Sequence, residues 1–265
     1  MAAGETAREP VTPREIVIRK CEGVEEFQAC VALQQEVWNF ADTDLIPVRM
    51  FVVADKIGGQ VIGAFDGSDM VGFALSIPGS RNGHPYLHSH MLAVRASYRN
   101  SGLGRRIKLF QREDALRTGF ELLEWTFDPL EIKNAFLNLE RLGAVARRYN
   151  INQYGITTSP LQGGLPTDRL VAEWWLRSRR VETLLASGSR APIAVEKMIT
   201  VPAEIYEWKA SDQHRARARA EQLRIRDEFL KGLAHGLAAL GYERDPHGNG
   251  TFLLGFWDEE WSYSE

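Results

Sequence analysis

Three apolar segments follow one another closely, at residues 60–65, 70–77 and 86–94, before the chain shows any long helical pattern. The first two are joined by Asp-Gly-Ser-Asp, a composition typical of tight turns, which predicts a β-hairpin. A polar loop at 78–85 leads to the third segment, so we expect three strands in an antiparallel meander. A meander excludes a purely parallel sheet and favours a mixed α/β fold of the α+β type.

The segments around the meander predict alternating helices and strands. Residues 102–119 lack proline and carry apolar residues on one face, which predicts a helix that ends at Gly119. A strand at 121–127 and a helix at 133–142 follow, so one right-handed crossover would join two parallel strands. We also expect a strand at 16–18, a helix at 27–37, a long loop at 155–167, strands at 170–176, 193–201 and 251–256, a short helix at 177–186, and a long helix from Ser211 or Asp212 to Leu240.

The length of 265 residues allows one or two domains with a substantial core. Residues 1–14 have two prolines and no periodicity, which predicts a flexible tail. We expect a first domain at 15–154 and a C-terminal α/β extension at 155–265, after the start of a segment rich in glycine, threonine and proline. The strand at 251–256 is a candidate for pairing across a homodimer.

The charge balance limits the classes of partner. Thirty-two Lys and Arg against 35 Asp and Glu give a net charge of −3, which disfavours nucleic acid or an acidic membrane as the main partner. The arginines between His214 and Arg226 lack interleaved aromatic residues, so we interpret them as a solvated helix face. No secretory signal and no membrane-spanning apolar stretch is evident, so we expect a cytoplasmic protein. Cys21 and Cys30 predict neither a disulfide framework nor a zinc site, and we expect no metal.

The segment from Leu92 to Arg106 has the most specific chemical pattern. An apolar strand breaks into a polar turn with Gly102 and Gly104, and a helix follows. Backbone N–H groups at such a turn, with the positive end of the helix dipole, form an anion site. The glycines permit positive φ and the close approach of a ligand, and basic side chains nearby can surround a phosphate. These basic residues are Arg99, Arg105, Arg106 and Lys108.

The run Arg99-Asn100-Ser101-Gly102-Leu103-Gly104 resembles the Arg/Gln-x-x-Gly-x-Gly/Ala motif of the GCN5-related N-acetyltransferases, the GNAT superfamily. The resemblance covers roughly residues 15–154 and implies a central mixed sheet flanked by helices. It also implies that backbone at Leu92 and Val94 binds the pantetheine arm of acetyl-CoA, and that the turn, through Arg105, binds the pyrophosphate. The family's downstream asparagine falls on Ile132, and Asn134, two residues later, is our candidate to contact the cofactor in its place.

A histidine pair precedes this motif on the same predicted strand. The period of a strand places His88 and His90 on one face. The run His-Ser-His-Met-Leu-Ala-Val is similar to that of the arylalkylamine N-acetyltransferases, where the pair helps to remove a proton from the acceptor. An alkylamine of pKa around 10.4 is only about 0.1% free base near neutral pH, so a proton acceptor is valuable. The resemblance implies acetyl transfer to a small-molecule or peptide amine with His88 and His90 as catalytic residues; the alternative that they only fill a half-buried strand stays open.

One position departs from the family's pattern. Leu139 falls where the family has a tyrosine that protonates the departing thiolate, and leucine cannot donate a proton. An alkyl thiol with a pKa near 8.5 leaves tolerably without complete protonation. Tyr149 and Tyr154 follow shortly as candidate substitutes. Leu139 favours the alternative function, a non-catalytic acyl-CoA-binding regulatory module.

Other patterns have simpler interpretations. Gly102-x-Gly104 also begins a dinucleotide-binding fingerprint, with Glu124 about 20 residues later, but Ile107 stands at the third glycine and the meander conflicts with that fold. Further polar residues could line an acceptor pocket, although a turn cap or an ion pair is the more frequent role of such residues. They are Asp128, Asp168, Arg169 and Glu173.

Overall fold

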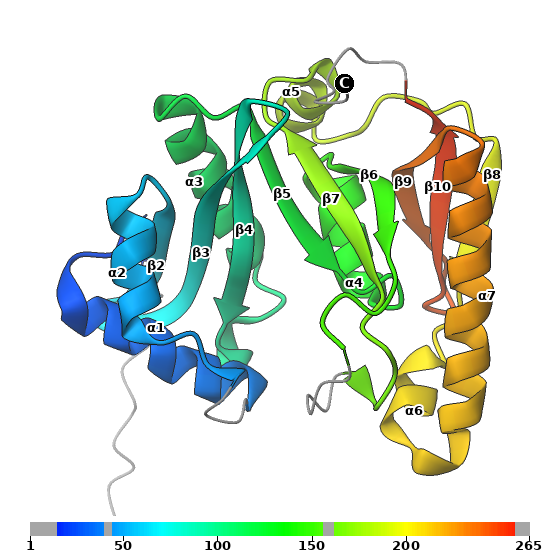
Figure 1. The fold of residues 1–265 in the computed structure, drawn as a ribbon, viewed down its shortest axis with the longest axis horizontal. Helices are drawn as coiled ribbons and strands as arrows, with labels where there is room; N and C mark the ends of the chain where they lie inside the picture. Colours follow the sequence, from blue (N-terminus) through cyan, green and yellow to red (C-terminus); the bar gives the residue numbers. More distant parts are fainter. Residues whose placement is uncertain (1–14, 40–43, 156–161, 258–265) are drawn as a thin grey trace, which may run out of the picture.

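The computed structural model describes residues 15–39, 44–155 and 162–257, and the predicted tail at 1–14 lies outside them. The strands are β1 (Val17–Lys20), β2 (Gln60–Asp66), β3 (Asp69–Arg81), β4 (His84–Val94), β5 (Leu122–Phe127), β6 (Val145–Asn150), β7 (Arg169–Trp175), β8 (Lys197–Val201), β9 (Leu237–Arg244) and β10 (Gly250–Phe256). Within these residues the ten strands form one sheet in the order β1-β2-β3-β4-β5-β7-β6-β9-β10-β8 (Figure 1). Neighbouring strands are antiparallel except β4 and β5, which are parallel. The predicted mixed α+β fold is confirmed.

The predicted meander is present, since β2 pairs with β3 and β3 pairs with β4. The expected polar loop at 78–85 is wrong, because β3 and β4 continue through it and leave only Asn82-Gly83 as the turn. Both turn residues have positive φ, 48° and 80°. Two-residue hairpin turns require this conformation, and Asn-Gly adopts it readily. The longer hairpin brings Arg81 close to the candidate site.

Helices cover both faces of the first half of the sheet. α1 (Gly23–Trp38) and α2 (Val48–Lys56) pack on one face, around Phe51 and Phe73. α3 (Leu103–Arg117) packs on the other face, around Ile62 and Ile107. The remaining helices are α4 (Ile132–Ala135), which continues into a π-helical turn (Phe136–Arg141), α5 (Arg179–Ser187), α6 (Ile205–Ala210) and α7 (Arg215–Ala234).

The last part of the chain extends the same sheet, and α7 packs on β6, β8 and β9. The predicted helix from 211 to 240 is wrong at both ends, because α7 begins at Arg215 and ends at Ala234. Gly236, with φ 78°, separates α7 from β9. Leucines at helical spacing continue past this glycine, but a left-handed residue ends a helix, so the later leucines lie on a strand. The strand predicted at 193–201 begins only at Lys197.

The predicted division of the chain at residue 154 stays a prediction. β7 follows that position in sequence but lies between β5 and β6 in the sheet. β6 then pairs with β9, so the sheet runs without interruption into the C-terminal part. Both proposed parts therefore share one set of hydrogen-bonded strands.

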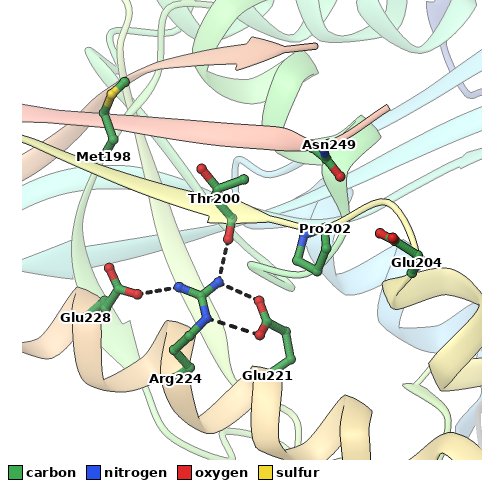
Figure 2. Close-up of a pocket in the computed structure, with 8 residues that line it drawn as sticks. All are labelled: Met198, Thr200, Pro202, Glu204, Glu221, Arg224, Glu228 and Asn249. Atoms are coloured by element: carbon green, nitrogen blue, oxygen red, sulfur yellow. Dashed lines mark hydrogen bonds and ion pairs between the residues drawn. The ribbon is translucent and has the colours of Figure 1, made fainter. Parts of the chain in front are cut away.

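The expectation that strand 251–256 pairs across a homodimer is wrong, because β10 already pairs with β8 on one side and β9 on the other. β8 is the edge strand. A cavity of about 510 Å³ lies between β8 and α7 (Figure 2). Arg224 lies in it and donates to Glu221, Glu228 and the backbone carbonyl of Thr200. The arginine and the two carboxylates in this cavity already pair with one another, so we do not place the functional site here.

Tyr242 of β9 is fully buried, and within the described residues its hydroxyl has no hydrogen-bond partner. An unsatisfied buried polar group costs about 1–3 kcal/mol. Tyr242→Phe is therefore expected to raise the free energy of unfolding by about 1 kcal/mol. Urea unfolding of the variant and the wild type measures the difference, and a lower stability of the variant would show that the hydroxyl contributes favourably.

Candidate functional site

β4 and β5 form a fork. They pair only through Leu87 with Leu123 and His88 with Glu124. Beyond these two pairs β4 follows β3 and β5 follows β7, so the two strands diverge (Figure 1). Within the described residues, the inner edge of β4 at 89–94 has no strand partner. Backbone N–H and C=O groups on such an edge are available to an extended ligand.

A β-bulge lies in β4 just beyond the last pair with β5. Ser89 lies opposite Ser76 of β3 and Met91 lies opposite Leu75, so His90 is the extra residue. Ser89 bonds to a side chain of α3 on one face, whereas Met91 packs with α1 and α2 on the other. His90 and Met91 therefore lie on the same face, since strand alternation resumes only after the bulge.

The turn between β4 and α3 lies at the open end of the fork. Asn100 and Gly102 have φ of 63° and 82°, and Gly102 precedes the first residue of α3. Successive residues in such conformations direct N–H groups to one side, and the unpaired N–H groups of the first helical turn add to them. Ser101 closes the turn by donating to the carbonyl of Tyr98 at 2.6 Å. The predicted anion-binding turn thus has the required backbone geometry.

Gly104 connects this turn to the fork. A methyl group at Gly104 would lie 3.9 Å from Leu92 and 4.0 Å from Val94, so the residue faces the free part of β4. Leu103 is buried beneath the sheet and anchors the helix. The structure therefore brings together the turn and the two β4 positions that the sequence predicts for the donor.

The basic side chains around the turn differ in where they point. The side chain of Arg99 donates to the carbonyl of Val94 at 3.0 Å, and that of Arg105 donates to the carbonyl of Arg141 at 3.2 Å. Both lie close to the turn. The expectation that Lys108 surrounds the same phosphate is wrong, because its ammonium is buried and bonds to Ser89.

His88 and His90 lie on the face of the sheet opposite α3, with ring centroids 6.1 Å apart. The surrounding protein covers part of both rings, and His88 is the less exposed of the two. Burial lowers the pKa of both imidazoles below their ordinary value of 6.5, and the positive charge of protonated His90 lowers the pKa of His88 further. Both rings are therefore neutral near pH 7 and able to accept a proton.

An ion cluster that the sequence analysis did not predict lies beside the histidines. Glu124 of β5 is in register with His88 and with Glu173 of β7. Both carboxylates are nearly fully buried, and each accepts hydrogen bonds from two arginines. Two acids within otherwise apolar strand sequences were the signal that could have predicted this cluster. The arginines are Arg81, Arg147 and Arg148, of which Arg148 bridges the two acids.

A solved acetyltransferase structure shares this architecture over part of the chain. The structure of yncA from Salmonella typhimurium, with its cofactor acetyl-CoA, aligns at a TM-score of 0.50 and 14% identity, over 68% of this chain and 99% of that chain. Over the aligned 68% of its length, the chain has a GNAT-like fold. The ribosomal-protein-S18-alanine N-acetyltransferase from Escherichia coli aligns at 0.49 and 14% identity, over 62% and 96% of the two chains. An acetyltransferase of the GNAT family from Streptococcus pneumoniae aligns at 0.48 and 18% identity, over 60% and 98%. No family model matches the sequence, and no curated protein matches it.

In this GNAT-like fold, α4 does not supply the hydroxyl that the family resemblance leads one to expect. Leu139 is fully buried in the core, and its π-helical turn differs from a regular helix. Asn134 is exposed on α4. Its predicted contact with the cofactor stays a prediction.

The two tyrosines considered as substitutes differ in their surroundings. The hydroxyl of Tyr149 donates to Asp168 at 2.8 Å, and burial raises the pKa of Tyr149. Its hydroxyl therefore has a structural partner and is a poor proton donor. The hydroxyl of Tyr154 lies 3.0 Å from that of Thr126 on β5. Thr126 lies two residues after Glu124 on β5, so both side chains point to the same face of the sheet. Tyr154 therefore lies on the same side of the fork as the histidines.

The remaining polar candidates have structural partners. Asp128 accepts from the backbone of Leu130 and from Lys209 at 2.9 and 3.0 Å, which makes it a turn cap and an ion-pair partner. Asp168 is fully buried and paired with Arg226. The arginines of α7 are also engaged, as Arg217 shows by lying 4.2 Å from the ring of Trp208. The simpler interpretation fits Asp128 and Asp168, but the expected solvated face of α7 is wrong at Arg226, which is 17% exposed and pairs with the buried Asp168.

In the described part of the chain, no three or more His, Cys, Asp or Glu residues are grouped so that they could hold a metal ion. Among the helices of residues 15–39, 44–155 and 162–257, none is long and apolar enough to cross a membrane.

Proposed function

We propose that this chain transfers an acetyl group from acetyl-CoA to an amine, with both substrates bound together. One observation carries the proposal: the turn between β4 and α3, which can bind an anion, directly follows the unpaired edge of β4. A pyrophosphate needs the first feature, and an extended chain of amide groups needs the second. Acetyl-CoA has both groups in one molecule, in this order along its length.

The donor would lie along β4. Backbone N–H groups from Arg99 to Gly104, with the side chain of Arg105, would hold the pyrophosphate, and backbone at Leu92 and Val94 would bind the pantetheine arm. Gly104 supports this fit, because a side chain there would project toward Leu92 and Val94. The thioester would then point toward the closed end of the fork.

The acceptor would bind beside the histidines, on the face of the sheet opposite α3. A neutral His88 or His90 would take a proton from the ammonium of the acceptor, directly or through water, and the free amine would attack the thioester carbon. The acceptor is a small-molecule or peptide amine. No resident metal enters the proposal, and we keep the expectation of a cytoplasmic protein.

Calorimetric titration with acetyl-CoA, CoA and NADH tests the donor site, with 3′-dephospho-CoA as a probe of the arginines. We expect micromolar binding of both coenzyme A species and none of NADH. Absence of binding by either coenzyme A species would remove the proposal.

Gly102→Val is expected to weaken acetyl-CoA binding at least about tenfold, because a β-branched residue resists the positive φ that directs the N–H groups. Gly119→Val is the matched control. Gly119 ends the same helix with φ 88°, and at both glycines a side chain meets open space. Both variants carry similar backbone strain, about 1–2 kcal/mol, so equal loss of binding in both would show that strain rather than the turn is responsible.

The alternative function is a non-catalytic acyl-CoA-binding module, favoured by the fully buried Leu139. Both functions predict acetyl-CoA binding. They differ in turnover, which release of CoA thiol across a panel of amines measures. Binding without thiol release would favour the module.

A further inference from the structure

Lys108 of α3 is a buried cation at the closed end of the fork, with 3% of its surface exposed. Its Nζ donates to Oγ of Ser89 at 2.8 Å and lies 3.7 Å from the ring centroid of Trp125. Ser89 follows the last β4 residue that pairs with β5, and Trp125 follows the last paired residue of β5. Lys108 therefore lies where the two strands begin to separate, on the face covered by α3.

The surroundings of Lys108 offer its ammonium few partners. Among the described residues, no carboxylate lies within ion-pair distance of Nζ. Gln111, which bonds to Ser89, is its uncharged neighbour on α3. Burial lowers the pKa of Lys108 to about 7, so the protonated and neutral forms coexist at neutral pH. The charged groups on the neighbouring elements are His88 on the other face of β4, Glu124 on the other face of β5, and Asp114 farther along α3, which pairs with Arg117.

We propose that Lys108 donates the proton that the coenzyme A thiolate receives as it leaves. The inference rests on the proposed function, because it requires the donor to lie along β4. Four residues separate Val94 from Ser89, and with the bulge at His90 the span is about 13 Å, which an extended pantetheine arm can follow. An acyl donor held at the turn would thus direct its sulfur toward the closed end, where Lys108 lies. Leu139 leaves no hydroxyl on α4 for this task.

The group transfer balances with these groups. Once the histidine has passed the first proton of the ammonium to solvent, the amine nitrogen forms a bond to the thioester carbon. A neutral His88 or His90 then receives the second proton that the nitrogen loses. The carbon–sulfur bond breaks, its electron pair goes to sulfur, and the ammonium of Lys108 gives sulfur a proton. Lys108 then takes a proton from solvent and the imidazolium returns one.

The geometry separates the two proton transfers. The histidines lie on the face of β4 opposite α3, while Lys108 reaches the fork from α3. The base would meet the incoming amine on one side, and the acid would meet the departing sulfur on the other. A pKa near 7 suits an acid that must protonate a thiolate and then regain its proton at neutral pH.

The ionisation of bound CoA tests the inference without an acceptor. The ultraviolet absorbance of the thiolate is followed for CoA bound to the wild type, to Lys108→Met and to the control Lys56→Met, from about pH 6 to pH 9 around the ordinary thiol pKa. An ammonium beside sulfur favours the thiolate, so we expect its fraction at pH 7 to be about tenfold higher in the wild type and the control than in Lys108→Met. Lys56 is an exposed residue at the end of α2.

Each outcome has one meaning. Equal thiolate fractions in the wild type and Lys108→Met, with CoA binding intact, would overturn the role of Lys108 and leave the proposed function standing. Failure of the wild type to bind CoA would overturn the proposed function, and this inference with it. If Lys108→Met does not fold, Ser89→Ala provides the comparison. This variant removes the hydroxyl that accepts from the Lys108 ammonium, which disfavours the charged form, so the thiolate fraction must fall. An unchanged fraction would count against the inference.

Discussion

The double substitution His88→Ala and His90→Ala is expected to lower kcat for amine acetylation by about 10²–10⁴-fold, the usual contribution of a general base. The donor contacts that we propose involve the turn and the backbone of β4, so the affinity for acetyl-CoA is expected to stay unchanged. Initial rates of thiol release, measured with an arylalkylamine, an amino acid and a lysine peptide, provide the comparison. The control is His247→Ala, in the turn between β9 and β10.

The same assignment predicts the direction in which kcat changes with pH. Burial holds the pKa of both imidazoles below 6.5, and the base acts in its neutral form. Wild-type kcat should therefore rise with pH through a value below 6.5 and should not need alkaline conditions. The double variant should lose this rise. An unchanged rate in the double variant would show that another group, such as Tyr154, handles the proton.

Glu124→Ala is expected to lower the free energy of unfolding by about 2–3 kcal/mol, the range for lost hydrogen bonds to a charged group, because the two arginines left behind are about a third exposed. The reason lies in its two arginines. Arg81 and Arg148 both bond to this carboxylate, whose side chain is 3% exposed, and both would lose a charged partner in a partly buried place. Chemical denaturation monitored by circular dichroism measures the change.

Two variants control for the loss of side-chain volume and for changes elsewhere on the surface. Glu124→Gln keeps the shape and removes the charge, so it should lie between the wild type and Glu124→Ala. Glu113→Ala changes an exposed acid of α3 and should change stability by less than about 0.5 kcal/mol. If Glu124→Ala were as stable as Glu113→Ala, the cluster would contribute little to the fold.

The sequence predicted the parts of the fold that local chemistry determines. Asp-Gly-Ser-Asp separates two apolar runs, and the β2–β3 hairpin follows from it. Gly102 and Gly119 mark the ends of α3, because each adopts the positive φ that a helix boundary tolerates. The strand, turn and helix of the proposed donor site could be predicted for the same reason, since they are consecutive in the chain. Their contacts with a donor stay a prediction.

Distant contacts could not be predicted in this way. The position of β7 between β5 and β6 depends on strand pairing across the molecule, and no local pattern specifies it. The Glu124 and Glu173 cluster requires that same pairing, since the two acids become neighbours only when β5 meets β7. Lys108 looked like a phosphate contact because its position along α3 does not reveal that its side chain points at Ser89.

The insertion of β7 also matters while the chain is being synthesised. β5 and β6 are complete before β7 emerges, yet each needs β7 as its neighbour. Until then the outer edge of β5 exposes unpaired N–H and C=O groups, and such an edge can recruit a strand from another molecule. A nascent chain that has exposed β5 and β6 but not yet β7 would hold this edge open, so the yield of folded protein should depend on how quickly β7 follows.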